Sequence, residues 1–185
     1  MRPRTIFAAA LALSLGLPAT ADEITDTLQS ALDAYNEGDN AYALEELDYA
    51  RQLLLALKTD ALVGFLPDAP EGWSREVNTK MSAGLAMMGG GTGAEATYRG
   101  DGDTITLQIM ADNPMVGALG GMIANAAMYG ARVERVGREK FMIKDGEMTG
   151  LVANRFLVKA SGKAPEDMIA LVEQIDFHAL KSLGQ

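Results

Sequence analysis

Hydrophobic residues recur with two different periods along this 185-residue chain, and the change of period divides it into two parts. Between residues 22 and 60, apolar positions lie three or four residues apart, which indicates amphipathic helices. From residue 95 onward, short segments alternate apolar and polar residues, which indicates strands with one buried face. The pattern therefore predicts a helical N-terminal part followed by a part built around a β-sheet.

Residues 22–60 are predicted to form a helical hairpin. Gly38 is expected to end the first helix, and Asp39 or Asn40 to cap the second. One hairpin cannot bury both of its sides, so we expect it to dock on the C-terminal part or on another chain. The apolar stripes with helical spacing are Ile24, Leu28, Ala31, Leu32 and Tyr35 in the first helix, and Ala43, Leu47, Ala50, Leu54 and Leu57 in the second.

The C-terminal part is predicted to contain strands joined by tight turns. "DTITLQIM" alternates cleanly, and the "GDGD" turn at 100–103 joins it to "EATYR". A second turn at Asp145 and Gly146 joins "EKFMIK" to "EMTGLVA", while "RVERV" and "RFLVKA" are expected to add further strands. One closing helix is predicted from Pro165, with His178 near its C-terminal end. The inner side of that helix is expected to carry Met168, Leu171, Val172, Ile175 and Ala179.

A proline-rich connector, residues 61–75, separates the two parts. Because proline fixes φ and extends the residue before it, "FLPDAPEGW" predicts a stiff strap, and its Trp73 is expected to close one edge of the core. The fold class is therefore α+β, with an N-terminal helical hairpin over 22–60 and a largely antiparallel sheet domain over 61–185. Helices are expected to cover one face of that sheet.

Two family resemblances accompany this pattern. The segment "LDAYNEGDNAYALEELDYA" resembles a single tetratricopeptide or Sel1-type repeat, through Tyr35, Gly38, Asp39, Ala43, Leu44 and Ala50. That resemblance implies a protein-binding hairpin, with Tyr35, Tyr42 and Tyr49 as candidate contacts, whereas a purely structural hairpin is the alternative. "LPDAPEGW" before the first strand, with this order of elements, resembles the start of PsbP-like domains, which implies an accessory or assembly subunit.

The segment "NPMVGALGGMIANAAMYGA", residues 113–131, contains no formal charge. Four glycines and Asn125 argue against a membrane span, since each glycine costs about 1 kcal/mol in a helix interior. The segment is therefore predicted to be a covered helix, with one bulky stripe. Either the acidic hairpin covers its outer side, or the stripe is exposed and receives a partner protein, an acyl chain or a membrane surface. That stripe consists of Met115, Leu119, Met122, Ala126 and Tyr129.

A second segment, "MSAGLAMMGGGTGAE" over 81–95, is predicted to be a mobile, methionine-bearing loop. It lacks the lysine and the following helix of a phosphate-binding loop. Met87 and Met88 are candidate contacts for the same partner or ligand as the stripe of residues 113–131.

Charge and composition indicate the compartment. "MRPR", a short apolar stretch and Ala19-Thr20-Ala21 predict a signal peptide over 1–21, so the protein is expected in the periplasm, with secretion as the alternative. Loss of Arg2 and Arg4 with that segment takes the formal net charge from −9 to −11. That charge disfavours nucleic acid and anionic lipid as partners. Most of it lies in residues 22–60, which hold ten acidic and two basic residues.

The chemistry-bearing residues give no catalytic pattern. The chain has no cysteine and one histidine, and neither G-x-S-x-G nor S-x-x-K occurs. No cofactor or metal site is predicted. Because the chain contains eleven methionines, whose thioethers can bind copper(I), copper(I) binding is a third hypothesis. An unrecognised enzyme is grouped with it. Five basic residues are interpreted as a solvated strand face or as ion-pair partners of the acidic hairpin. They are Arg132, Arg135, Arg138, Lys140 and Lys144. The sequence thus favours a non-catalytic accessory protein that acts by protein contacts, ahead of a carrier or sensor of an apolar ligand.

Overall fold

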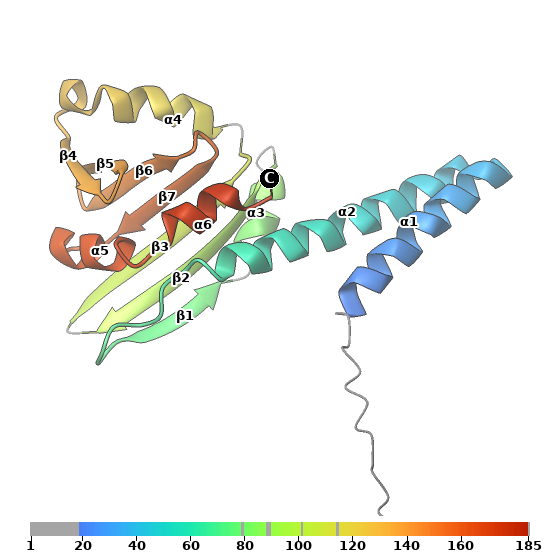
Figure 1. The fold of residues 1–185 in the computed structure, drawn as a ribbon, viewed down its shortest axis with the longest axis horizontal. Helices are drawn as coiled ribbons and strands as arrows, with labels where there is room; N and C mark the ends of the chain where they lie inside the picture. Colours follow the sequence, from blue (N-terminus) through green and yellow to red (C-terminus); the bar gives the residue numbers. More distant parts are fainter. Residues whose placement is uncertain (1–18, 79, 88–89, 101, 114, 185) are drawn as a thin grey trace, which may run out of the picture. The chain divides into compact units, whose positions relative to one another are not determined.

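A computed structural model of the chain describes residues 19–78, 80–87, 90–100, 102–113 and 115–184 (Figure 1). Residues 1–18 of the predicted signal peptide lie outside the described residues. The backbone divides into two compact units whose boundary falls between Leu54 and Leu55, inside one long helix. Among the described helices, none has the length and apolar character needed to cross a bilayer.

The first unit is the predicted helical hairpin. Helix α1 spans Ala19–Glu37 and helix α2 spans Asn40–Val63, three residues beyond the predicted end. Gly38 has a φ of +85°, which lets the chain reverse between the helices. The Asp39 carboxylate accepts a hydrogen bond from the amide of Tyr42 at 3.1 Å, so Asp39 is the predicted N-cap.

The two helices of the hairpin pack through small residues. Ile24, Ala31 and Ala34 on α1 are buried, as are Ala43 and Ala50 on α2. Alanine lets two helices approach closely. The predicted stripes are therefore divided: their alanines lie in the contact between the helices, and most of their leucines remain exposed.

The second unit contains one seven-stranded sheet among the described residues, with neighbouring strands antiparallel. The strands run in the order β1-β2-β3-β7-β6-β5-β4. Each predicted strand is confirmed, and β1 follows directly on the strap. The bounds are β1 Ser74–Asn78, β2 Thr92–Gly100, β3 Asp103–Ala111, β4 Arg132–Val136, β5 Glu139–Lys144, β6 Glu147–Val152 and β7 Phe156–Ser161.

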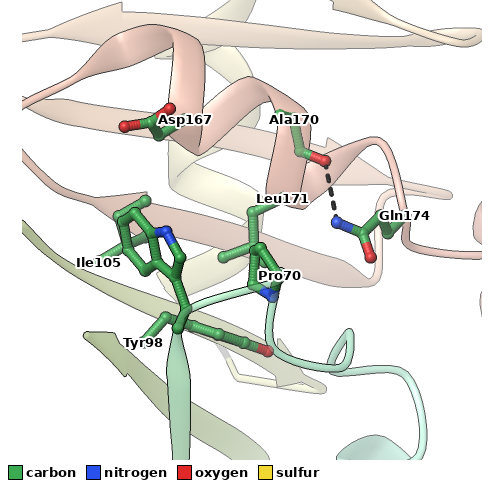
Figure 2. Close-up of a pocket in the computed structure, with 8 residues that line it drawn as sticks. Pro70, Tyr98, Ile105, Asp167, Ala170, Leu171 and Gln174 are labelled. Carbon is green, nitrogen blue, oxygen red and sulfur yellow. Dashed lines mark hydrogen bonds between the residues drawn. The ribbon is translucent and has the colours of Figure 1, made fainter. Parts of the chain in front are cut away.

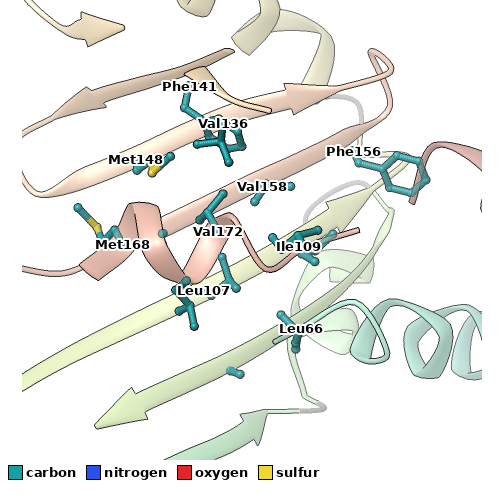
Figure 3. Close-up of a cluster of buried hydrophobic side chains, with 14 of the residues drawn as sticks. Leu66, Leu107, Ile109, Val136, Phe141, Met148, Phe156, Val158, Met168 and Val172 are labelled. Atoms are coloured by element: carbon teal, nitrogen blue, oxygen red, sulfur yellow. The ribbon is translucent and has the colours of Figure 1, made fainter. Parts of the chain in front are cut away.

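Helices cover both faces of the sheet, not one face as the sequence predicted. Figure 3 shows α5 (Pro165–Val172) packing over the sheet residues of the main core. That core also contains Leu62 and Leu66, from the end of α2 and the strap, and Leu180 from α6 (Phe177–Ser182). On the opposite face, α3 (Met81–Met87) lies over β2, and α4 (Met115–Ala124) lies over β5 and β6.

The strap is shorter than the predicted range 61–75, because residues 61–63 belong to α2 and residues 74–75 to β1. It begins after α2, at Gly64, and ends before β1. The buried hydroxyl of Tyr98 donates a hydrogen bond of 2.7 Å to the carbonyl of Pro67. Trp73 is half-buried against the core and covers Gly100, where an added Cβ would lie 2.5 Å from the indole ring. Trp73 therefore closes one core edge, as predicted.

Three predicted segments differ from the structure. The uncharged segment 113–131 is not one helix, because α4 ends at Ala124 and a separate 3-10 helix, η1, spans Ala126–Tyr129. The predicted loop over 81–95 contains α3 and the start of β2. The closing helix is two helices, α5 and α6, and His178 is the second residue of α6 instead of a C-terminal residue.

Candidate functional site

Apart from Leu57 on α2, the exposed large hydrophobic residues described in the second unit lie on one short stretch from α4 to β4. Met128 is 84% exposed, Tyr129 49%, Val133 48% and Met122 37%. The contacts between η1 and β4 place the two elements side by side. We call the surface made by these four residues the α4–β4 patch. Such a concentration of exposed apolar side chains is typical of a contact surface.

A break in the helix creates this patch. The amide and the side chain of Asn125 both donate hydrogen bonds to the carbonyl of Gly121, at 3.2 and 2.9 Å, and α4 ends there. The chain then tightens into η1, buries Ala126 and ends at Gly130 with a φ of +68°. Met128 and Tyr129 consequently lie on the outside of η1.

The structure divides the predicted bulky stripe. Met122 and Tyr129 are exposed as the partner hypothesis expected, whereas Leu119 is half-buried and Ala126 is fully buried. The side chains of Met115 and Met87 and the whole of Met88 lie outside the described residues. Met128 and Val133 belong to the surface but not to the predicted stripe. Met128 lies on η1, after the break at Asn125, and Val133 lies on β4, outside the predicted segment.

A groove of about 390 Å³ runs along α4 beside the patch. Its apolar residues are Ile123, Val133 and Leu151, and its basic residues are Arg138 and Lys140. Gly120 lets α4 approach the sheet closely, since an added Cβ would lie 3.1 Å from the Leu151 side chain. The lining of the groove therefore combines apolar residues with two cations, and its acidic residue Glu139 is paired with Lys181.

Three cations at this end of the sheet have no acidic partner among the described residues: Arg135, Arg138 and Lys140. Arg135 lies directly opposite Lys140 in the β4–β5 register, and like charges in that position repel each other. The nearby carboxylates are already engaged, because Glu134 pairs with Arg132 at 3.4 Å and Glu139 with Lys181 at 2.5 Å. An acidic group brought to this edge would relieve the repulsion.

The hairpin presents a second apolar surface, which we call the leucine side. It consists of Leu28, Leu32, Tyr35, Leu44, Leu47 and Leu54, all of them exposed. Most of these residues line a groove of about 440 Å³ between α1 and α2. No charged residue lines that groove.

The opposite side of the hairpin is acidic. Asp26, Asp33 and Glu37 of α1 line a separate groove there, together with Tyr42. The hydroxyl of Tyr49 donates a 2.7 Å hydrogen bond to Glu23, and the bond and charge of that carboxylate raise the pKa of Tyr49. The three candidate tyrosines thus do not form one site, because Tyr35 lies on the leucine side and the other two do not.

A small pocket lies between the strap and α5 (Figure 2). Pro70, Trp73 and Tyr98 line one side of it, and Asp167 and Gln174 lie on α5 and the turn that follows. Its volume is about 150 Å³, whereas pockets for drug-sized ligands measure roughly 300–1,000 Å³. Burial raises the pKa of Tyr98 to about 12, so its hydroxyl stays protonated and bound to the strap. This pocket is best described as an edge of the core.

Asp112 forms an ionic cluster at the end of β3. Its carboxylate accepts hydrogen bonds from Lys58 and from Arg155, the latter at 2.8 Å, and these bonds lower the pKa of Asp112. Arg155 also donates a hydrogen bond of 2.6 Å to the carbonyl of Leu183. Its guanidinium carbon lies over the ring of Phe156, 4.9 Å from the ring centroid. Because the cluster joins α2, β3, the β6–β7 turn and the C-terminal segment, we interpret it as structural.

The described residues include no group of three or more His, Asp or Glu side chains placed to hold a metal ion. His178 is exposed on α6. Among the methionines, Met110 is half-buried and Met122 is exposed, whereas Met148 and Met168 are buried in the core. No protein-family model, curated protein or solved structure matches this chain.

Proposed function

We propose that this protein is a non-catalytic, exported accessory protein that acts by protein–protein contacts. The carrying observation is the α4–β4 patch, where four exposed hydrophobic side chains lie beside three cations that have no acidic partner in the described part of the chain. The resemblance of the hairpin to tetratricopeptide repeats and of the sheet domain to PsbP-like domains supports the same class of function.

The chemistry of the patch defines the partner. Met128 and Tyr129 favour an apolar protein surface, because thioether and aromatic side chains adapt well to such contacts. Arg135, Arg138 and Lys140 favour carboxylates around that surface. We therefore expect an exported protein with an acid-rimmed apolar contact area.

Two substitutions test this proposal against matched controls. A Met128→Glu bait should lose the partner from a periplasmic extract, whereas Met128→Leu should retain it. Arg135→Glu should also lose the partner, whereas Lys163→Glu reverses an exposed charge on another loop and should retain it. Binding by wild type should weaken as salt rises, since the rim contacts are screened. Equal capture by Met128→Glu and wild type would exclude the patch as the contact.

A carrier of an amphiphilic ligand is the second candidate. The groove along α4 combines Ile123 and Leu151 with the cations Arg138 and Lys140. That lining suits an apolar chain that ends in an acidic group. Native mass spectrometry of the purified protein tests this: a copurified acyl ligand lost on Lys140→Glu substitution would favour the carrier over the accessory protein.

A further inference from the structure

The leucine side of the hairpin remains exposed after α1 and α2 have packed against each other. The contact between α1 and α2 is already made by Ile24, Ala31 and Ala34 against Ala43 and Ala50. Leu32 and Leu54 nevertheless remain about half exposed, at 52% and 51%. About half of each of these side chains is left uncovered by the hairpin, so their full burial requires another surface.

The leucine side has the spacing of a coiled-coil seam. On α1, Leu28, Leu32 and Tyr35 are separated by four and then three residues. On α2, positions 44, 47, 51 and 54 are separated by three, four and three residues. This alternation is the a/d pattern, whose side chains interdigitate with those of a facing helix. Two adjacent helices with such seams form one half of a four-helix bundle.

The distribution of charge selects the occupant of the leucine side. No charged residue lines the groove, and Asp26, Asp33 and Glu37 lie on the opposite side of α1. A partner chosen by its positive charge would find no acidic residue in the lining of the groove. A second leucine side, by contrast, matches it in polarity and spacing and leaves both acidic sides facing water.

We propose that two copies of this chain pair through their leucine sides, hairpin against hairpin, in a two-fold symmetric four-helix bundle. A two-fold axis brings the same surface of both copies together, which suits a surface that is mostly apolar and has no charged residue in its groove. Arg51 is the one charged residue among the seven seam positions, and it pairs with Asp48 of its own helix at 3.6 Å. A polar group at a single seam position fixes the register of the helices. The protein is then a dimer with two α4–β4 patches.

The oligomeric state of the exported chain, from Asp22 onward, tests the proposal by sedimentation equilibrium. Wild type should have twice the mass of one chain. Leu47→Glu places a charge in the seam and should weaken self-association at least tenfold. Tyr42→Glu adds the same charge at an exposed site on the acidic side and should remain dimeric. Circular dichroism and thermal unfolding check that the sheet domain of each variant is folded.

A second measurement keeps the test independent of folding defects. Dimerisation stabilises the folded state by mass action, so the melting temperature of wild type and Tyr42→Glu should rise with protein concentration. That of Leu47→Glu should not. A monomeric wild type, a Leu47→Glu variant as dimeric as wild type, or a leucine side filled by a copurified lipid would each overturn the proposal. Met128→Glu leaves the leucine side intact, so loss of the partner and loss of the dimer are distinguishable.

Discussion

Gly150 shows how one missing side chain controls the packing of the sheet. It lies opposite Phe141 in the β5–β6 register, and an added Cβ would lie 2.4 Å from the phenylalanine ring. Phe141 is fully buried and tilted against Phe177 at a ring separation of 6.0 Å, so the ring has little room to move. The aromatic ring thus occupies the space that any side chain at position 150 would need.

We expect Gly150→Ala to destabilise the fold by about 2 kcal/mol, the usual cost of overpacking a core. For a chain of this size the melting temperature should fall by roughly 4–8 °C. Gly121→Ala is the matched control, because its Cβ would meet nothing within 4 Å and alanine favours the helix. Thermal unfolding followed by circular dichroism measures both, and equal melting temperatures would contradict the packing argument.

Asp112 makes the stability of the sheet domain depend on pH. Hydrogen bonds from Arg155 and Lys58 lower its pKa in the folded state, below the value of about 3.9 of an unfolded aspartate. The charged form is therefore stabilised by folding. This contribution is present above the unfolded pKa and is lost as the pH falls through the folded pKa.

Asp112→Asn should accordingly be less stable than wild type at pH 7, and the difference should shrink as the pH falls below about 4. The φ of residue 112 is +54°, which asparagine also tolerates. Asp145→Asn is the control: the φ of Asp145 is +50°, and its one ion pair among the described residues, with Lys144, is 4.0 Å long. Denaturant titrations across this pH range measure the effect. A pH-independent gap between Asp112→Asn and wild type would show that charge is not its source.

At the scale of elements, local capping decides where helices begin. The carboxylate of Asp176 accepts hydrogen bonds from the amides of His178 and Ala179, at 3.0 and 2.9 Å. This cap starts α6 and separates it from α5. Because α6 carries the buried Leu180 into the core, its start also matters for packing.

Asp176→Ala should lower the free energy of unfolding by about 1 kcal/mol. Asp176→Asn and Asp176→Ser should keep most of the stability of wild type, because both side chains can still cap the helix. Urea denaturation measures the difference. If all three variants unfold at the same midpoint, the cap does not stabilise α6.

How well an element could be predicted depended on how local its cause is. Gly38 and Asp39 act within one turn, and the Asp145–Gly146 pair closes one hairpin, so these features were evident from the sequence. The break at Asn125 was not, because the uncharged segment looks uniformly helical until the sheet packs against α4. Helix α3 was missed because it depends on the packing of Met81 and Leu85 over Gly93.

The candidate surfaces could be predicted only in part, because they too depend on contacts between residues far apart in the sequence. Leu28 and Ala31 belong to one apolar stripe in the sequence, yet the structure places alanine between the helices and leucine outside. The separate spacing of alanines and leucines within each helix was the available signal. Likewise, the basic residues around position 135 were recognised, but their position beside Met128 and Val133 requires the fold.

At the scale of the whole molecule, the core indicates which part of the chain folds independently. Every residue of the main core lies between Leu62 and Leu180, and the residues packed around it reach from Val63 to Leu183. The unit boundary at Leu54 and Leu55 leaves that core intact. The hairpin, in contrast, buries mainly small side chains.

Residues 55–185 alone should therefore fold cooperatively, keep the β-sheet signal in circular dichroism and sediment as a monomer. Leu62→Ala within that fragment should lower its stability by about 2–5 kcal/mol, because Leu62 is fully buried in the core.

The isolated hairpin, residues 22–54, is too short to be stable alone, and its helicity should rise with concentration as leucine sides pair. An unfolded fragment 55–185 would mean that the hairpin completes the core of the sheet domain, and concentration-independent helicity of the hairpin would mean that its alanine contact suffices.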